Sequence, residues 1–258
     1  MNLLKSAASV LGIVLVMYVG AIALLYAKQR SLLYFPQFTR DPVVEPNFSL
    51  EVDGATLSGW VLNPGQPRAL LYFGGNAQDL SFGLDSVTEW APGHTVYLVA
   101  YRGFGRSTGE PSEAALAADA IALFDFAAAR HDSVDVYGRS LGSGVATHVA
   151  DARPVRRLAL ITPFDSVAAV GRTAYPFAPI DWLLKDRFES DLRAPRLRMP
   201  TLVIIADGDE VIPTSNSEAL VAAFPTPPEV LRLSEARHAD VQEFPEYAET
   251  LRRFFGSE

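Results

Sequence analysis

The segment Gly138-Arg139-Ser140-Leu141-Gly142 places a serine in a G-x-S-x-G pattern. It follows a short apolar run, residues 134–137, and precedes a helical stretch, residues 141–150, so the serine falls on a sharp strand-to-helix turn. Such a turn exposes the hydroxyl as a nucleophile and aims the backbone N–H of Leu141 at the oxyanion that an attacked carbonyl would form. The pattern is also compatible with a tight connection in which Ser140 only caps the helix.

A serine hydroxyl needs a base, and the chain contains four histidines: His94, His131, His148 and His238. We favour His238 as the general base, because it follows the last predicted strand in a loop at the strand's carboxyl end, where open α/β sheets gather their sites. His94 precedes a strand, His131 ends a helix away from that edge, and His148 lies two turns along the helix after the serine. These three are predicted to be structural or solvated.

The acid that orients the histidine is expected from Asp207-Gly208-Asp209-Glu210, the loop after the apolar run 201–206. Asp209 is favoured because it lies beyond the turn at Gly208, whereas Asp207 is predicted to brace that turn and Glu210 to be solvated. The D-x-D-E spacing lacks the further ligands and the glutamate at position 12 of a calcium loop, so no metal is predicted. The chain has no cysteine, which excludes thiol nucleophiles and thiolate metal sites.

A second oxyanion donor is expected from Gly74-Gly75-Asn76-Ala77, which follows the apolar run 69–73. The two glycines let the backbone approach a ligand closely, and the N–H of Asn76 is the favoured donor, with Ala77 second. Together with Leu141 it would complete an oxyanion hole. The dinucleotide pattern G-x-G-x-x-G is missing from this loop, so no cofactor is predicted.

Short apolar runs that alternate with helical stretches position these residues. The runs are 69–73, 96–100, 134–137, 158–161, 202–206 and 230–233, and the helical stretches include 114–129, 141–150, 217–224 and 247–255. Strands that are buried on both faces and separated by helices predict a mostly parallel, doubly wound α/β sheet flanked by helices. Alternation across residues 48–62, with a turn at Asp53-Gly54, adds a preceding hairpin.

Residues 7–27 carry no charge and, at about 1.5 Å per residue, are long enough to cross a hydrocarbon core of about 30 Å. We predict that residues 1–30 form an uncleaved single-pass membrane anchor, because a signal peptide has a shorter apolar core. Lys5 on one side and Lys28 and Arg30 on the other leave the side of the membrane open. Residues 31–47 are predicted to be an extended tether, and residues 48–258 the catalytic domain, with a short cap at about 165–200.

The net charge of the chain limits the classes of partner that it can bind. Its 258 residues carry a net charge of −8, which argues against binding to nucleic acid or to anionic lipid by broad attraction. The hydrophobic content of 49% suits a chain that buries a core and excludes disorder. The sequence does not indicate an oligomeric state.

The assembled segments resemble those of the α/β-hydrolase superfamily, and more narrowly its membrane-anchored BEM46-like group, which is related to serine aminopeptidase-type hydrolases. The resemblance covers nearly the whole chain and rests on residues 73–79, 101–113, 138–144, 162–166 and 209–213. It implies an α/β-hydrolase fold with a short cap. The nucleophile, acid, base and oxyanion amides that it implies are Ser140, Asp209, His238, Asn76 and Leu141.

Three positions depart from the family pattern. Gly74 stands where the family commonly has histidine, Ala206 where the strand usually ends in glycine, and Ala236-Arg237 where glycines usually precede the histidine. None of them removes an atom of the triad. The loop at Gly74 is expected to be looser or to use a different brace.

The predicted function is a serine hydrolase that cleaves esters, thioesters or amides of a small-molecule acyl substrate through an acyl-enzyme. The anchor and the aromatic, proline-broken residues 174–184 favour a lipid-like or acylated substrate. Alternatives are a serine peptidase or aminopeptidase, a perhydrolase with the same triad, and a catalytically impaired, membrane-tethered interaction module. The order of Ser140, Asp209 and His238 along the chain disfavours the last.

Overall fold

Eight strands form one sheet across residues 2–39 and 41–257, which the computed structural model describes. The strands are β1 (Phe48–Val52), β2 (Ala55–Leu62), β3 (Arg68–Phe73), β4 (His94–Val99), β5 (Ser133–Arg139), β6 (Leu158–Ile161), β7 (Thr201–Ala206) and β8 (Glu229–Leu233). Their order is β1-β2-β4-β3-β5-β6-β7-β8. The pairs β1–β2 and β2–β4 are antiparallel and the rest are parallel, which confirms the predicted mostly parallel sheet.

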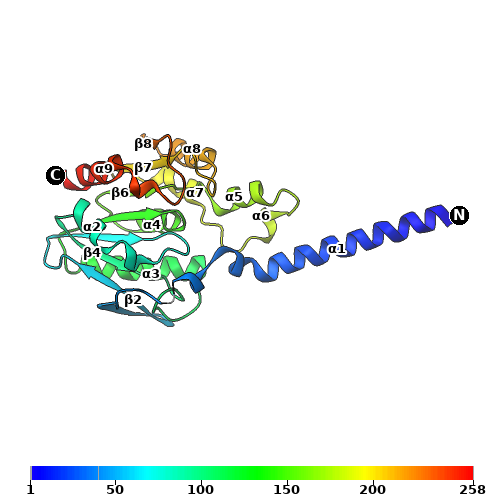
Figure 1. Ribbon diagram of the computed structural model, residues 1–258, viewed down its shortest axis with the longest axis horizontal. Helices are drawn as coiled ribbons and strands as arrows, with labels where there is room; N and C mark the ends of the chain where they lie inside the picture. The colour runs from blue at the N-terminus through cyan, green and yellow to red at the C-terminus, as the bar shows by residue number, and fades with distance from the viewer. Residues whose placement is uncertain (1, 40, 258) are drawn as a thin grey trace.

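Helices cover both faces of the sheet (Figure 1). One face carries α3 (Glu113–Ala128), α4 (Leu141–Ala152) and α8 (Thr214–Ala223), and the other carries α2 (Leu84–Trp90) and α9 (Pro245–Gly256). The segment predicted as a cap, about 165–200, contains α5 (Val167–Ala174), α6 (Ile180–Leu183), α7 (Ser190–Arg193) and the 3-10 turn η3 (Ala194–Arg196). Further 3-10 turns are η1 (Pro36–Phe38), η2 (Leu80–Phe82) and η4 (Val241–Glu243).

The core lies in two layers, one on each side of the sheet. Successive side chains of a strand point to opposite faces, so Leu71 and Phe73 of β3 join the layer under α3 and α4, while Leu70 and Tyr72 join the layer under α2 and α9. Apolar side chains dominate both layers. The central strands are covered on both faces and are mostly apolar, which is the signal that predicted them.

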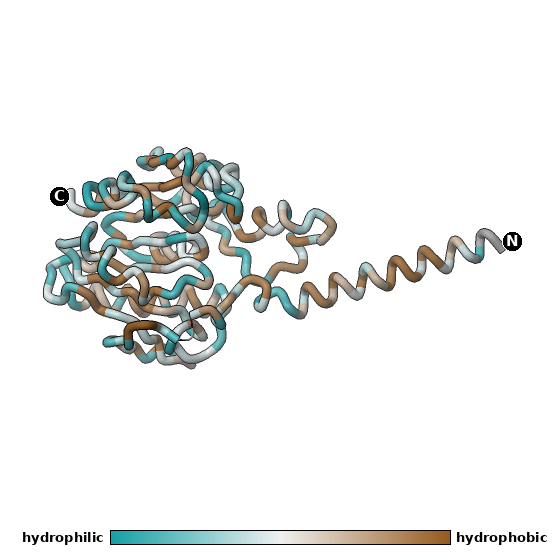
Figure 2. The backbone as a smooth tube through the Cα atoms, viewed as in Figure 1, coloured by the Kyte–Doolittle hydropathy of each residue, from teal (hydrophilic) through white to brown (hydrophobic). Residues whose placement is uncertain are grey.

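Helix α1 (Asn2–Leu33) projects from the body and is apolar along most of its length (Figures 1 and 2). It is long and apolar enough to cross a membrane, and most of the apolar side chains described from residue 5 onward are exposed. The helix extends beyond residues 7–27, the stretch predicted to span the membrane. The segment predicted as an extended tether, residues 31–47, therefore begins with helical residues. Residues 31–33 are helical, η1 follows, and Tyr34 is only 2% exposed, because its ring packs into the core against the body.

Candidate active site

Ser140 lies on the turn between β5 and α4, as the sequence predicts. Its backbone has φ +51° and ψ −118°, a strained conformation for a residue with a side chain. The turn is held on both sides, since the N–H of Ser140 donates to the carbonyl of Ile161 at 2.9 Å and the hydroxyl of Ser143 donates to the carbonyl of Ser140 at 2.6 Å. The rigid turn fixes where the Ser140 hydroxyl points.

The two glycines of the pattern let helix α4 approach the sheet. A Cβ on Gly142 would lie closer to the carbonyl oxygens of Phe73 and Gly74 than side chains tolerate, and a Cβ on Gly138 would meet the carbonyl of Gly142 in the same way. Backbone, which cannot swing aside, surrounds both positions. Glycine is therefore required here for packing.

Replacing Gly142 by alanine is expected to destabilise the fold by about 1–3 kcal/mol, because the added methyl group must push α4 away from β3. Chemical denaturation of the detergent-solubilised protein measures this. Gly256→Ala is the matched control, since a Cβ on Gly256 meets nothing within 4 Å. Equal stability of the two variants would contradict the packing requirement.

The three predicted triad side chains lie together. Nε2 of His238 is 2.9 Å from Oγ of Ser140, and Nδ1 of His238 is 2.8 Å from Oδ2 of Asp209. Residues 140, 209 and 238 come from the loops after β5, β7 and β8, so the parallel strands bring them to one edge. The arrangement can relay a proton from the hydroxyl to an imidazole that a carboxylate orients.

Asp209 is held in a way that suits this orienting contact. Its side chain is 3% exposed, and Oδ1 accepts the backbone N–H groups of Val211 at 2.8 Å and Ile212 at 2.7 Å. Because Oδ1 is occupied by these donors, Oδ2 is left to face the histidine ring. The carboxylate cannot rotate without losing both amide bonds.

Of the two neighbouring carboxylates, Asp207 differs from its predicted role. Asp207 does not hydrogen-bond the turn but pairs with Arg232 of β8, with Oδ1 3.0 Å from Nε and 2.6 Å from Nη2. Glu210 is exposed, as predicted, and its Oε2 also accepts the backbone N–H of His238 at 3.3 Å. Both contacts join the β7 loop to the last part of the sheet, and partners this distant in sequence leave no local signal.

Arg139 is a positioning residue that the sequence argument missed. Its Nη2 donates to the backbone carbonyls of His238 at 2.9 Å and Ala239 at 3.2 Å. The residue before the serine thus ties down the loop that carries the histidine. The only available signal was a cation at a variable position of the G-x-S-x-G pattern.

Arg139→Met is expected to lower the turnover of an acyl substrate about tenfold, because the histidine loop loses two hydrogen bonds while the apolar stem of the side chain is retained. Arg139→Lys, which keeps a cationic donor, should recover most of the loss. The measurement is kcat alongside the thermal unfolding midpoint. Wild-type kcat in Arg139→Met would rule out the positioning role.

The loop after β3 lies against the serine turn, and its brace is now visible. A Cβ on Gly75 would be 3.7 Å from Cβ of Ser140. The N–H of Gly75 donates to Oε1 of Gln78 at 2.8 Å, and the buried hydroxyl of Tyr101 donates to the carbonyl of Gly74 at 2.8 Å. Burial raises the pKa of Tyr101 well above its ordinary value, so this hydroxyl stays protonated. Gln78 and Tyr101 therefore hold the loop in place. They are the different brace expected because Gly74 stands where the family commonly has a histidine.

Asn76 follows Gly75 and is fixed through its side chain. Its Oδ1 accepts the N–H of Phe35 at 3.1 Å, and its Nδ2 donates to the carbonyl of Leu33 at 2.6 Å. The backbone N–H of Leu141 is in the first turn of α4, where amides have no partner within the helix. The two predicted oxyanion donors thus flank the serine turn, and the end of α1 is attached to one of them.

The other three histidines lie away from the serine turn, and two of them have polar partners. Nε2 of His94 is 2.8 Å from Oδ2 of the buried Asp135, and the ring of His131 lies 2.9 Å from the hydroxyl of Tyr97. His148 lies on α4, and burial lowers the pKa of its ring. The lowered pKa favours the neutral form of the ring. Of the four histidine rings described, only that of His238 contacts Ser140.

Comparisons with known proteins point to one group. No family model matches the chain. The chain is 35% identical to an uncharacterized protein of Mycobacterium tuberculosis (strain H37Rv), covering 90% of this chain and 88% of that protein. It is 33% identical to the alpha/beta hydrolase domain-containing protein aho-3 of Caenorhabditis elegans, covering 76% and 59%. It is 29% identical to the protein bem46 of Schizosaccharomyces pombe, covering 75% and 74%.

Solved structures share the fold at low identity. A hydrolase from Pseudomonas aeruginosa superposes with a TM-score of 0.63 at 21% identity, covering 81% of this chain and 98% of that one. The esterase Pf2001 of Pyrococcus furiosus gives a TM-score of 0.65 at 18% identity, covering 84% and 98%. At this identity the likeness establishes the fold of the body.

Proposed function

The chain belongs to the BEM46-like group of the α/β-hydrolase superfamily, and from this premise we propose that it is a membrane-anchored serine hydrolase. The bond cleaved is an ester, thioester or amide, and the reaction passes through an acyl-enzyme. The observation that carries the proposal is the position of His238, whose two ring nitrogens contact Ser140 and Asp209 at once.

Each residue has one role in the reaction. As Oγ of Ser140 attacks the substrate carbonyl, Nε2 of His238 accepts the hydroxyl proton and Asp209 stabilises the resulting imidazolium. The N–H groups of Asn76 and Leu141 bind the oxyanion of the tetrahedral intermediate. His238 then returns the proton to the leaving group, which departs and leaves the acyl group on Ser140. Water, deprotonated by the same histidine, hydrolyses this acyl-enzyme.

The anchor is supported by contacts between α1 and the body. Arg30 forms an ion pair with the buried Asp186 at 2.9 Å, and Leu33 and Phe35 bond to Asn76. The hydroxyl of Tyr18 also donates to the carbonyl of Phe177 at 3.0 Å, and cleavage of the helix as a signal sequence within residues 21–27 would remove this contact together with most of the apolar span. We therefore infer an uncleaved anchor that holds the site close to the bilayer, and a lipid-like or acylated substrate.

A fluorophosphonate probe tests the nucleophile directly. The full-length protein in detergent is expected to be labelled on Ser140, and Ser140→Ala and His238→Ala are expected to lose the label, because the probe reacts with an activated serine. Intact mass and proteolytic mapping measure the label. Folded wild-type protein without label would overturn the proposal in favour of a tethered interaction module.

If the probe labels Ser140, protein that has not been exposed to the probe can then be assayed against esters, thioesters, peptides with a free amino terminus, and peroxide. Turnover of a peptide but not of acyl esters would replace the esterase proposal with a peptidase. Acceptance of the acyl group by peroxide in preference to water would indicate a perhydrolase.

A further inference from the structure

The segment from α5 to α6, residues 167–183, forms a hairpin that projects from the body on the same side as α1 (Figure 1). Side chains of α1 contact it at two levels. The hydroxyl of Tyr18 donates to the carbonyl of Phe177 at 3.0 Å, and Nε2 of Gln29 donates to the carbonyl of Leu183 at 3.2 Å. The cap hairpin, as we call residues 167–183, therefore lies along α1 between these levels.

These contacts fix the depth of the cap hairpin relative to the apolar helix. Tyr18 lies in the middle of the uncharged residues 7–27, and it is separated from Gln29 by roughly 16 Å at the helical rise of about 1.5 Å per residue. If the hairpin stood in water, residues 18–27 would also stand in water. Of the uncharged residues, only 7–17 would remain to cross the bilayer. Their helical length of roughly 16 Å is about half of the thickness of a hydrocarbon core, which is about 30 Å.

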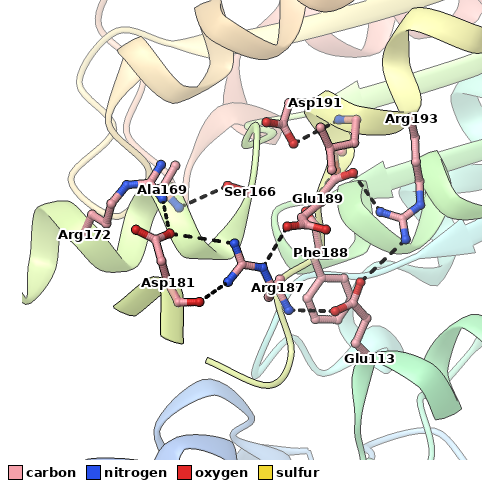
Figure 3. A network of polar contacts seen from close by, with 12 residues as sticks. Glu113, Ser166, Ala169, Arg172, Asp181, Arg187, Phe188, Glu189, Asp191 and Arg193 are labelled. Carbon is pink, nitrogen blue, oxygen red and sulfur yellow. Dashed lines mark hydrogen bonds and ion pairs between the residues drawn. The ribbon is translucent and has the colours of Figure 1, made fainter. Parts of the chain in front are cut away.

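The tip of the cap hairpin has a surface suited to lipid. Phe177, at the tip, is 58% exposed. Trp182, next to Leu183 at the level of Gln29, is 89% exposed, and tryptophan gathers at the interface between lipid and water. The charges on the two helices of the hairpin are paired, since Nη1 of Arg172 on α5 lies 2.7 Å from Oδ1 of Asp181 on α6 (Figure 3). Towards the body, Lys185 lies over the ring of Tyr26 at 4.3 Å and supplies a cation at the level expected for headgroups.

An apolar cavity of about 130 Å³ lies between α1 and the cap hairpin. Its lining is almost wholly apolar, and includes Leu25, Leu33, Val167, Tyr175, Ala178 and Ile180. The cavity is open on one side, and its apolar lining suits an apolar guest. Leu33 connects this cavity to the site, because its carbonyl accepts the side-chain N–H of Asn76.

We propose that the tip of the cap hairpin is embedded in the bilayer beside α1, and that the cavity between them receives an acyl chain from the surrounding lipid. The chain enters sideways from the hydrocarbon, and the body end of the cavity is at Leu33, whose carbonyl accepts the side-chain N–H of Asn76 in the loop beside the serine turn. This inference rests on the proposed anchor, and it adds a second membrane-embedded element and a place for the acyl group.

Spin labels measure the depth of the cap hairpin, and the absence of cysteine from the chain makes single-cysteine variants free of background. Full-length Phe177→Cys, Val14→Cys and Val230→Cys are labelled and reconstituted in phosphatidylcholine vesicles. Collisions with oxygen and with a water-soluble nickel chelate are then compared. Val14 reports on α1, and Val230, 40% exposed on β8, is the aqueous control.

We expect the labels at Phe177 and Val14 to favour oxygen and the label at Val230 to favour nickel. A label at Val14 in lipid with a label at Phe177 in water overturns the embedded hairpin and leaves the anchor standing. A label at Val14 in water overturns the anchor and this inference together.

A photoreactive lipid tests the cavity without relying on turnover. Phosphatidylcholine with a diazirine on its acyl chain is added to the vesicles, illuminated, and its crosslinks are mapped by mass spectrometry. Crosslinks at Leu33 and Val167 are expected to fall several-fold in Ala178→Phe, which fills the cavity. Ala174→Phe, at an exposed position outside the lining, is the matched control and should keep them. Crosslinks confined to the hairpin tip and equal in both variants would overturn the acyl-chain cavity, whatever the outcome of the fluorophosphonate test.

Discussion

Ser140→Ala is expected to lower the turnover of an acyl substrate by about 10⁴-fold or more, because no acyl-enzyme forms without the hydroxyl. The residual rate would come from the oxyanion donors and from substrate binding. Stability should change by about 1 kcal/mol or less, since the turn is held by backbone bonds to Ile161 and Ser143 that the substitution retains. Steady-state kinetics and thermal unfolding of the same preparation measure both quantities.

Ser133→Ala is the matched control, since it removes a serine hydroxyl at the opposite end of the same strand, β5. It should leave turnover near the wild-type value. Wild-type activity in Ser140→Ala would exclude Ser140 as the nucleophile, and equal losses in both variants would point to damage of the strand rather than of the chemistry.

The sheet could be predicted because its signal is local. Each central strand is an apolar run because helices cover both faces, and the helical stretches between the runs force parallel crossovers. The G-x-S-x-G turn is equally local, since Gly138 and Gly142 answer a steric demand within one strand-to-helix connection. Strand order then brings the loops of Asp209 and His238 to the serine without any further signal.

The supports of the site could not be predicted, because they join residues far apart in sequence through bonds without a periodic pattern. Arg139 reaches the carbonyl of His238, and Tyr101 reaches the carbonyl of Gly74. The predicted tether was read from its prolines, which report on local backbone only. Burial of Tyr34 depends on the body against which it packs, and that surface exists only in the folded chain.

The loop after β7 holds three carboxylates, and substituting two of them separates their roles. Asp209→Asn is expected to reduce kcat by about 10⁴-fold, because an amide NH₂ facing Nδ1 of His238 favours the tautomer whose proton sits on Nε2. That nitrogen could then no longer accept the proton of Ser140. The amide oxygen can still accept the N–H groups of Val211 and Ile212, so the loop should keep its shape.

Asp207→Asn is the matched control, with the same change of atoms two residues away. It weakens only the pair with Arg232, and a partly exposed pair of this kind contributes about 1 kcal/mol or less, so kcat should fall by less than about tenfold. The reverse ranking would make Asp207 the acid. Equal, severe losses would mean that the charge of the loop matters more than the position of Asp209, and the 2.8 Å contact with His238 would then not be the one that orients the base. A large loss of kcat in Asp209→Asn alone would mean that turnover depends on the tautomer of the His238 ring.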